Sequence, residues 1–389
     1  MRQTVGAPRT WEAWREEFPI FRRRLYYNTC SLCALARSVA EAVHTFLGQW
    51  EESGASAWYG PWLAEIESLR AVFARLIGAK LDEVAIFPSV TAALTAVASA
   101  YDYRARPKVV ISEREFPTTV YQWLAKVERG VDVHLLRSPD ALTVPPELYE
   151  RAVDGRTQLV VASHVYFTSG AIQDIAALAA IAHGQGAHLL VDAYQAAGQL
   201  PINVRETGVD FLVTGGLKWL LGGPGIAYLF ARREAAAALR PADVGWFAHR
   251  NQFAFEVHRL EYAPGARRFE GGTPAVGAVY AARAGMAIVE EIGVDRLRAR
   301  QVALVDHLVA SAQERGLRPR LPARLQDLAG IVTIPRENPA AVVAALRERQ
   351  VIIDHRPGVI RLSPYFYNLP EDGERVIGEL AALERRGIR

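Results

Sequence analysis

Short apolar runs alternate with amphipathic stretches between about residues 84 and 230. The runs have the length and composition of strands that are buried on both faces, and the Ala-rich stretches between them have helical spacing. This alternation predicts an α/β fold, with a mostly parallel seven-stranded sheet sandwiched by helices. The predicted strands cover residues 83–87, 108–112, 131–136, 158–163, 188–192, 210–215 and 226–230.

The pattern changes toward the carboxyl end. Helical segments over about 276–313 precede a shorter α+β pattern, which ends in a helix after Pro370. Its predicted elements are a strand at 331–334, a helix at 339–350 and strands at 351–354 and 359–363. We therefore expect three units: an N-terminal segment at 1–30 that packs with the small domain, a large domain at 31–270 and a small C-terminal domain at 271–389.

Composition narrows the class of protein. A chain of 389 residues, half of them hydrophobic, can bury a large core. A formal net charge of +3 is small for this length, so we expect neither a nucleic-acid partner nor a membrane partner. The first 24 residues mix charges with aromatics and contain no segment resembling a signal peptide, and no stretch is apolar enough to span a bilayer. The sequence predicts a soluble cytoplasmic protein.

Two common kinds of site lack their usual motif. Cys30 and Cys33 form a C-x-x-C pair without a second pair to complete a zinc site, and no H-x-x-x-H pattern occurs, so we expect no metal. The chain also has no G-x-G-x-x-G after a strand and no Walker loop. Dinucleotide and nucleotide triphosphate binding are therefore disfavoured.

Lys218 and Asp192 carry the main chemical signal. Lys218 is one of four lysines in the chain and follows Asp192 by 26 residues. Asp192 ends the predicted strand 188–192, and Lys218 follows the strand 210–215, so both lie at the sheet edge where open α/β folds bind ligands. Considered alone, Asp192 would indicate a helix cap, and Lys218 would indicate a surface cation. Together they favour pyridoxal phosphate (PLP), which needs a lysine for its Schiff base and a carboxylate beside its pyridinium nitrogen.

A phosphate site is predicted where the strand 83–87 leads into a helix through Ser89, Val90 and Thr91. The amino terminus of a helix offers free N–H groups and a positive dipole end to phosphate oxygens. An ordinary Ser/Thr cap is the more frequent use of such a sequence. The phosphate interpretation depends on the neighbouring lysine and aspartate.

Five motifs occur along the chain in one order: EFPTTVYQW (115–123), SHVYFTSG (163–170), GWFAH (245–249), FEGGTP (269–274) and VIRLSPYFYNLPED (359–372). In this order they resemble the class V aminotransferase family of fold-type I PLP-dependent enzymes, and they are most similar to the branch that contains kynureninases, selenocysteine lyases and cysteine desulfurases. The resemblance covers nearly the whole chain. It implies the fold-type I PLP-dependent transferase fold and a homodimer with active sites at the interface.

The resemblance also implies roles for individual residues. Phe116 would stack on the cofactor ring, Gln195 would hydrogen-bond its phenolic oxygen, and His164 would point at the same sheet edge; the alternatives are a core phenylalanine and a structural histidine. Arg361 and Asn28 would bind the substrate carboxylate. Thr273 and Trp246 would reach the phosphate of the neighbouring subunit.

Some positions depart from the family pattern. Kynureninases generally carry aspartate, histidine and tyrosine where this chain has Thr119, Gln195 and Leu217. A persulfide-forming desulfurase needs a nucleophilic cysteine in the carboxyl-terminal third, and no cysteine follows Cys33. Kynurenine hydrolysis and persulfide formation are therefore both disfavoured.

The reaction common to such enzymes passes through an external aldimine and a quinonoid, with the released Lys218 as the base for the Cα proton. We expect a PLP-dependent enzyme that acts on an α-amino acid, with β-lyase chemistry (C–S or C–C cleavage) and no catalytic cysteine. Transamination, epimerisation and decarboxylating oxidative deamination are the alternatives within PLP chemistry. Two alternatives do not involve PLP catalysis. One is a non-catalytic PLP-fold binding protein, and the other is a Rossmann-type oxidoreductase, which the missing glycine motif disfavours.

Overall fold

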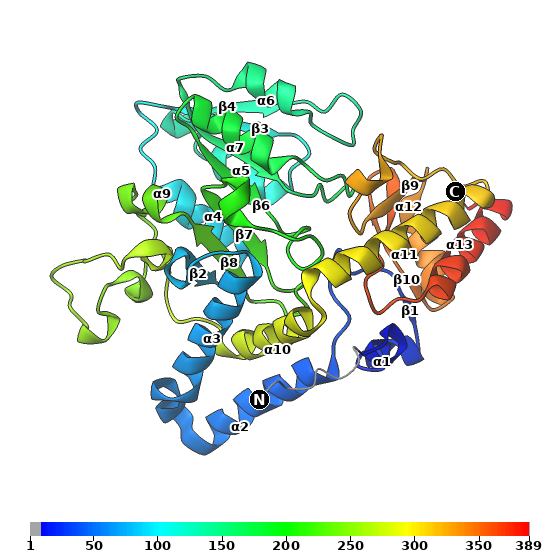
Figure 1. Ribbon diagram of the computed structural model, residues 1–389, viewed down its shortest axis with the longest axis horizontal. Coiled ribbons are helices and arrows are strands. Elements are labelled where there is room, and N and C mark those ends of the chain that lie inside the picture. Colours follow the sequence, from blue (N-terminus) through cyan, green and yellow to red (C-terminus); the bar gives the residue numbers. More distant parts are fainter. Residues whose placement is uncertain (1–8, 389) are drawn as a thin grey trace, which may run out of the picture.

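The computed structural model describes residues 9–388 and is built around one seven-stranded sheet (Figure 1). In spatial order its strands are β2 (Val84–Phe87), β8 (Ala227–Ala231), β7 (Phe211–Gly215), β6 (His188–Asp192), β5 (Thr157–Ser163), β3 (Lys108–Ser112) and β4 (Asp132–Leu136). Strand β8 is antiparallel to both of its neighbours, and the pairs from β7 to β4 are all parallel. The predicted α/β fold with a mostly parallel sheet is confirmed.

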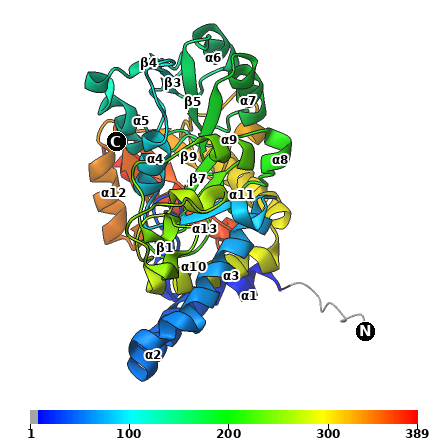
Figure 2. The same cartoon turned by 90° about the vertical axis from the view of Figure 1, so that its left-hand side faces the viewer.

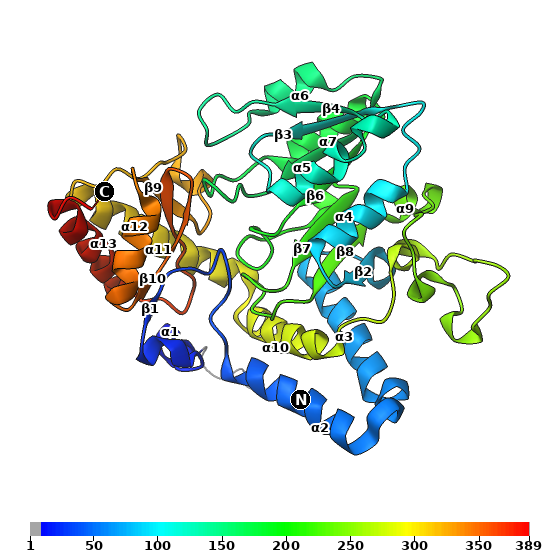
Figure 3. The same cartoon turned by 180° about the vertical axis from the view of Figure 1, so that it is seen from behind.

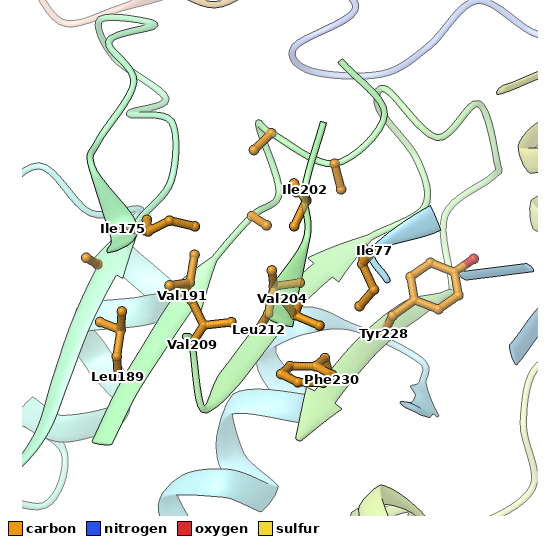
Figure 4. Close-up of a cluster of buried hydrophobic side chains, with 14 of the residues drawn as sticks. Ile77, Ile175, Leu189, Val191, Ile202, Val204, Val209, Leu212, Tyr228 and Phe230 are labelled. Atoms are coloured by element: carbon orange, nitrogen blue, oxygen red, sulfur yellow. The ribbon is translucent and has the colours of Figure 1, made fainter. Parts of the chain in front are cut away.

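Both faces of this sheet are buried, as the continuous apolar runs predict. On β6, Leu189 and Val191 pack into one hydrophobic cluster, and Leu190 between them packs into the cluster on the other face. Figure 4 shows Leu189 and Val191 side by side with Leu212 of β7 and Phe230 of β8. Each large aliphatic side chain buried in this way contributes about 1.5–3 kcal/mol of transfer free energy.

Helices on the two faces provide the rest of the two clusters. The first face is covered by α3 (Pro61–Leu76), α6 (Pro146–Ala152), α7 (Ile175–Gly184) and α10 (Val276–Ile292). The second face is covered by α4 (Val90–Ser99), α5 (Pro117–Leu124) and α9 (Arg233–Ala238). Figure 2, turned by 90°, shows α4 and α5 on the opposite side of the strands from α7. The short helix α8 (Val204–Thr207) lies between β6 and β7 in the chain.

A smaller antiparallel sheet follows toward the carboxyl end. Its order is β11 (Asp354–Arg356), β12 (Val359–Leu362) and β9 (Val332–Pro335), and its helices are α11 (Val294–Glu314), α12 (Pro339–Glu348) and α13 (Pro370–Arg385). Figure 1 shows this orange and red unit beside the large sheet, with α11 leading into it. A cluster of its own, which includes Val332, Ile360 and Ile377, forms the core of this unit.

One predicted strand is divided in the structure, and the predicted helical segments form two helices. The predicted strand 351–354 splits into β10 (Val351–Ile352), which pairs with β1 (Leu25–Tyr26), and β11, which pairs with β12. The predicted helical segments over 276–313 are α10 and α11, separated at Gly293, whose φ of 82° lies outside the helical range. Apolar periodicity does not record a change of pairing partner, so the strand break could not be read from it.

The amino-terminal segment packs on the carboxyl-terminal part of the chain. After α1 (Trp11–Arg15), the Phe18 ring lies 4.7 Å from the Tyr367 ring, and Arg15 forms an ion pair with Asp372 at 2.5 Å. Helix α2 (Arg37–Ser53) then runs beside α10 along the base of the molecule, as Figure 3 shows from behind. The domain boundaries at residues 30 and 270 stay a prediction. Among the described residues, none of the helices is long and apolar enough to cross a membrane.

Candidate active site

A cavity of about 230 Å³ lies between the amino terminus of α4 and the carboxyl end of β6. Five of the residues predicted from the sequence to bind a cofactor line it together: Ser89, Val90, Thr91, Phe116 and Asp192. The remaining lining residues are Pro88, Thr118, Thr119, Tyr194, Leu217, Gly225 and Ile226. Residues that are more than 100 positions apart in the chain therefore meet at one edge of the sheet.

Asp192 is the last residue of β6, and its side chain is held in place on both carboxylate oxygens. Oδ1 accepts a hydrogen bond from the Tyr194 backbone N–H at 2.8 Å, and Oδ2 accepts one from the Thr119 hydroxyl at 3.2 Å. The residue is only 5% exposed, and burial raises the pKa of its carboxyl above the usual value. A buried carboxylate with this environment favours a cationic N–H partner.

Lys218 lies in the loop that follows β7. Its Nζ is 4.1 Å from the centroid of the Tyr194 ring, so the ammonium faces the aromatic π system. The same loop holds Leu221 at a φ of 59°, a left-handed conformation that costs a non-glycine residue about 1–2 kcal/mol. Strained backbone of this kind occurs where the surrounding structure fixes a functional loop.

The environment of Lys218 makes its amine easier to deprotonate than that of an ordinary lysine. Burial lowers the pKa of the Lys218 amine to about 8. Cys30 and Asp192 oppose this shift, and the positive charges of Arg361 and Arg356 add to it. At pH 7 roughly a tenth of such amines are unprotonated, compared with fewer than one in a thousand for an ordinary lysine.

The first turn of α4 faces the cavity with Ser89, Val90 and Thr91. Ser89 is the N-cap residue, and its hydroxyl accepts a hydrogen bond from the Ala92 backbone N–H at 3.2 Å. The first N–H groups of a helix have no acceptor inside the helix, so they are available to an anion. The capping role and the phosphate role are therefore compatible at this position.

Phe116 stands at the mouth of the cavity as the N-cap residue of α5, with 41% of its surface exposed. Its ring meets the edge of the Phe167 ring at a centroid distance of 5.2 Å. An exposed phenylalanine on a cavity wall leaves one face free for a planar ligand.

Gln195 makes its side-chain contacts with Cys30 and Trp219. Its Nε2 donates to the Cys30 carbonyl at 2.9 Å, and its Oε1 accepts from the Trp219 indole at 2.8 Å. Gln195 thus connects the amino-terminal segment to the lysine loop. One Nε2 hydrogen remains beyond these two bonds, so the predicted contact with a cofactor oxygen stays a prediction.

His164 directly follows β5, and its backbone N–H donates to the Asp192 carbonyl at 2.9 Å. Burial lowers the pKa of its imidazole to about 4, so the ring is neutral at physiological pH. Its Nδ1 is buried without a hydrogen-bond partner. Such an unsatisfied group is costly unless a ligand or water pairs with it.

Arg361 lies on β12 and is 1% exposed. Its Nη1 donates to the Phe167 carbonyl at 2.7 Å, and its Nη2 donates to Ser31 and forms an ion pair with Asp354. The Nε atom of Arg361 is buried without a partner. Asn28 is close to Arg361 in the fold, because Asn28 forms a β-bridge with Ser363, two residues after Arg361.

Thr273 and Trp246 lie outside the cavity. Thr273 is exposed and lines a neighbouring cavity between β2, α4 and the 271–275 loop. Trp246 is 37% exposed and stacks on Phe255, in a loop that Figure 1 shows projecting from the body of the molecule. Neither residue lines the cavity that contains Asp192, so their predicted role depends on a second subunit.

Sequence reasoning missed two charged groups near this site. Glu115 is fully buried, accepts hydrogen bonds from Ser112 at 2.7 Å and Ser163 at 2.5 Å, and has its pKa raised by burial to about 8. Asp354 pairs with both Arg361 and Arg356. Glu115 is the first residue of the motif EFPTTVYQW. Asp354 ends the apolar run 351–354, and an acidic residue at the end of a strand was the available signal for it.

The residues of the cavity fit PLP. The free N–H groups of α4 suit the phosphate, Phe116 offers a ring face, and Asp192 supplies a buried carboxylate. Lys218 supplies an amine with a lowered pKa beside them. Among residues 9–388 no group of three or more His, Cys, Asp or Glu could hold a metal ion.

Three known proteins are similar to this chain over most of its length. "Uncharacterized aminotransferase YcbU" of Bacillus subtilis (strain 168) is 38% identical over 372 residues, which cover 95% of this chain and 97% of the relative. A kynureninase of Bacillus mycoides (strain KBAB4) is 28% identical and covers 92% and 88%. The cystine C–S lyase C-DES, solved with glycine covalently linked to its PLP cofactor, has the same fold, with a TM-score of 0.86, 21% identity and coverage of 94% and 98%.

The family model for aminotransferase class V matches residues 34–374, which include the cavity, Lys218 and Arg361. This match and the relative with 38% identity confirm the predicted family, and with it the predicted PLP cofactor. The chain belongs to the class V aminotransferase family of PLP-dependent enzymes.

Proposed function

We propose that this enzyme is a β-lyase, which cleaves a C–S or C–C bond of an α-amino acid without a cysteine nucleophile. The observation that carries this proposal is the combination of a cavity whose residues fit the cofactor with the position of the cysteines. Both Cys30 and Cys33 precede α2 and are buried, at 1% and 8% exposure. No cysteine in the carboxyl-terminal half is available to take sulfur from a substrate.

Bound PLP supplies an electron sink that acidifies the Cα proton of an amino acid. Asp192 would keep the ring nitrogen protonated, because its buried carboxylate lacks a full counter-charge. Lys218 would accept and return the Cα proton, since its lowered pKa leaves part of the amine unprotonated at neutral pH. Phe116 would exclude water from one face of the ring.

Arg361 would bind the substrate carboxylate. The guanidinium is 1% exposed, is positioned by the Phe167 carbonyl, and retains a buried Nε without a partner. A carboxylate can satisfy this donor and gain a charge-assisted hydrogen bond. Asn28, next to Arg361 through its bridge to Ser363, is placed to assist the same carboxylate.

The relatives support lyase chemistry and also keep one alternative open. The kynureninase relative, by its name, belongs to a class that cleaves a C–C bond. The relative with 38% identity carries the name aminotransferase, which favours transamination as the second candidate. Returning the proton to the cofactor rather than to the substrate would give that outcome. Epimerisation, decarboxylating oxidative deamination and a non-catalytic binding role have no comparable support.

We also propose that the enzyme works as a homodimer, as predicted from the sequence. Thr273 and Trp246 are exposed and lie outside the cavity of their own chain. A second subunit would bring them to the phosphate of the neighbouring site. The cytoplasmic location stays a prediction.

An absorbance spectrum together with product analysis tests this function. The protein is loaded with PLP and mixed with cysteine conjugates, kynurenine and simple amino acids. A lyase releases pyruvate or alanine from one substrate class, whereas a transaminase releases the corresponding 2-oxo acid and needs an acceptor. Lys218→Ala should lose the cofactor band and the activity, and the exposed Lys80→Ala should keep both. Cofactor binding without any product from the whole panel would contradict the lyase proposal.

A further inference from the structure

Two guanidinium groups and one carboxylate form a cluster on the small sheet, next to Phe167. Asp354 and Arg356 lie on β11, and Arg361 lies on the adjacent β12. The Asp354 carboxylate pairs with Arg356 at 2.9 Å and with Arg361, and it also accepts from Ser31 at 2.5 Å. The cluster as a whole therefore carries a net charge of +1.

The Asp354 and Arg356 side chains are partly exposed, at 20% and 31%, and Phe167 connects the cluster to the wall of the cavity. The Arg361 guanidinium donates to the Phe167 carbonyl, and that of Arg356 lies 5.9 Å from the Phe167 ring. The Phe167 ring in turn meets Phe116 on the cavity wall. Both arginines are close enough to Lys218 to lower the pKa of its amine.

The charge of the cluster matches one carboxylate. When the α-carboxylate of an amino acid binds Arg361, the group of Asp354, Arg356, Arg361 and substrate becomes neutral. A second carboxylate on the substrate would leave an uncompensated negative charge in a site of low dielectric constant, close to Asp354 itself. Burial opposes ionisation of Asp354, but the Ser31 hydrogen bond and the charge of Arg361 lower its pKa to about 2, so this carboxylate remains charged.

The geometry points to Asp354 as a specificity-determining residue. By neutralising one of the two guanidinium groups, it selects α-amino acids that carry a single carboxylate and excludes dicarboxylic ones. The inference rests on the proposed function, because it takes Arg361 as the receptor of the substrate carboxylate. It adds the class of substrate: an amino acid whose side chain carries no carboxylate.

Binding of two matched, unreactive ligands tests this inference. Butanoate and succinate have the same chain length and differ by one carboxylate. Their dissociation constants are measured by calorimetry on the PLP-loaded protein and on the variants Asp354→Asn, Arg356→Gln and the double variant. Asp102→Asn is the matched control, because Asp102 also pairs with an arginine two residues later, at 2.6 Å, but on an exposed surface.

We expect Asp354→Asn to shift the preference from butanoate toward succinate by roughly tenfold, since it raises the net charge of the cluster from +1 to +2. Arg356→Gln alone should weaken both ligands, and the double variant should restore the preference for butanoate. The control should keep the preference of the unchanged protein. These outcomes depend on charge, so a merely structural role of Asp354 would not produce the recovery in the double variant.

An equal preference in all four proteins would overturn the inference while leaving the proposed function intact. A protein that binds PLP but neither ligand, and forms no product with any amino acid, would overturn both the proposed function and the inference. Thermal unfolding of each variant shows whether it is folded. If Asp354→Asn is unfolded, the comparison of Arg356→Gln with the unchanged protein still tests the inference. An affinity for butanoate that Arg356→Gln leaves unchanged would contradict the proposed charge balance.

Discussion

The Nζ atom of Lys218 lies 4.1 Å from the centre of the Tyr194 ring, and Tyr194 in turn follows Asp192 by two residues. The backbone N–H of Tyr194 donates to the Asp192 carboxylate. Tyr194 therefore touches both Lys218 and Asp192, the two residues that we propose to hold the cofactor. The two groups are positioned relative to each other through Tyr194 as well as through the pairing of β6 with β7.

Replacing Gly215 by alanine should disturb this arrangement. A Cβ atom on Gly215 would lie 2.3 Å from the Tyr194 ring, so the ring would have to move away from Lys218. We expect Gly215→Ala to weaken PLP binding by about tenfold or more, measured by titration of the cofactor absorbance. Gly223→Ala is the control, since its Cβ would meet Ala281 at an ordinary 3.7 Å. Equal affinities in the two variants would show that the ring position is unimportant.

The attachment of PLP to the cofactor-free protein should depend on pH. In the role proposed for Lys218 only its unprotonated amine reacts with PLP, and burial lowers the pKa of that amine to about 8. The rate should therefore rise roughly tenfold per pH unit below pH 7 and level off above about pH 8. Stopped-flow absorbance between pH 6 and pH 10 measures it. A rate that keeps rising up to pH 10 would indicate an ordinary lysine.

Much of this site was predictable from the sequence because parallel strands bring their carboxyl ends to one edge. Asp192 ends β6 and Lys218 follows β7, so the strand pattern alone places them near each other. The lining of one cavity by Ser89, Phe116 and Asp192 agrees with the same rule. The large sheet was predictable for a similar reason, since strands that are buried on both faces are continuously apolar.

The contacts of the polar side chains were not predictable. Asp354 meets Ser31 across 323 positions, and Gln195 meets Cys30 across 165. No local pattern records which strand end faces which loop, because those contacts depend on how the small sheet is placed against the large one. The split of the predicted strand 351–354 has the same origin, since β10 pairs with β1 from the other end of the chain.

Glu115 should make the stability of the cofactor-free protein depend on pH. Burial raises the pKa of its carboxyl from the ordinary value of 4.5 to about 8 in the folded protein. A carboxyl with a raised pKa favours the folded state fully below pH 4.5, and this contribution is lost as the pH rises toward 8. Glu115→Gln removes the ionisation, so we expect it to be more stable than the unchanged protein by roughly 4 kcal/mol at about pH 8. The two proteins should differ little at about pH 4.5.

Urea unfolding at pH 5 and pH 8 measures this difference. Glu113→Gln is the comparison, because Glu113 is exposed on the same strand connection. A Glu115→Gln variant that is less stable at both pH values would mean that its hydrogen bonds to Ser112 and Ser163 outweigh the ionisation.

Arg70 and Glu270 form a buried ion pair that should matter for stability rather than catalysis. The Arg70 Nη1 lies 2.6 Å from the Glu270 Oε1, and the two side chains are 2% and 4% exposed. Arg70 also donates to the Val84 carbonyl, and Glu270 accepts from the Ile86 N–H, so the pair fixes α3 and the 270 loop against β2. Removing one partner leaves an uncompensated buried charge.

We therefore expect Arg70→Met to lower the free energy of unfolding by about 3–5 kcal/mol. Arg75→Met is the control on the same helix, because its pair with Glu290 is 61% and 31% exposed and should contribute less than about 1 kcal/mol. Chemical unfolding of the cofactor-free proteins separates the two. The double variant Arg70→Met with Glu270→Leu should recover part of the loss, since it removes the orphaned carboxylate along with its partner. No recovery in the double variant would mean that the hydrogen bonds to β2, rather than the unpaired charge, dominate the cost.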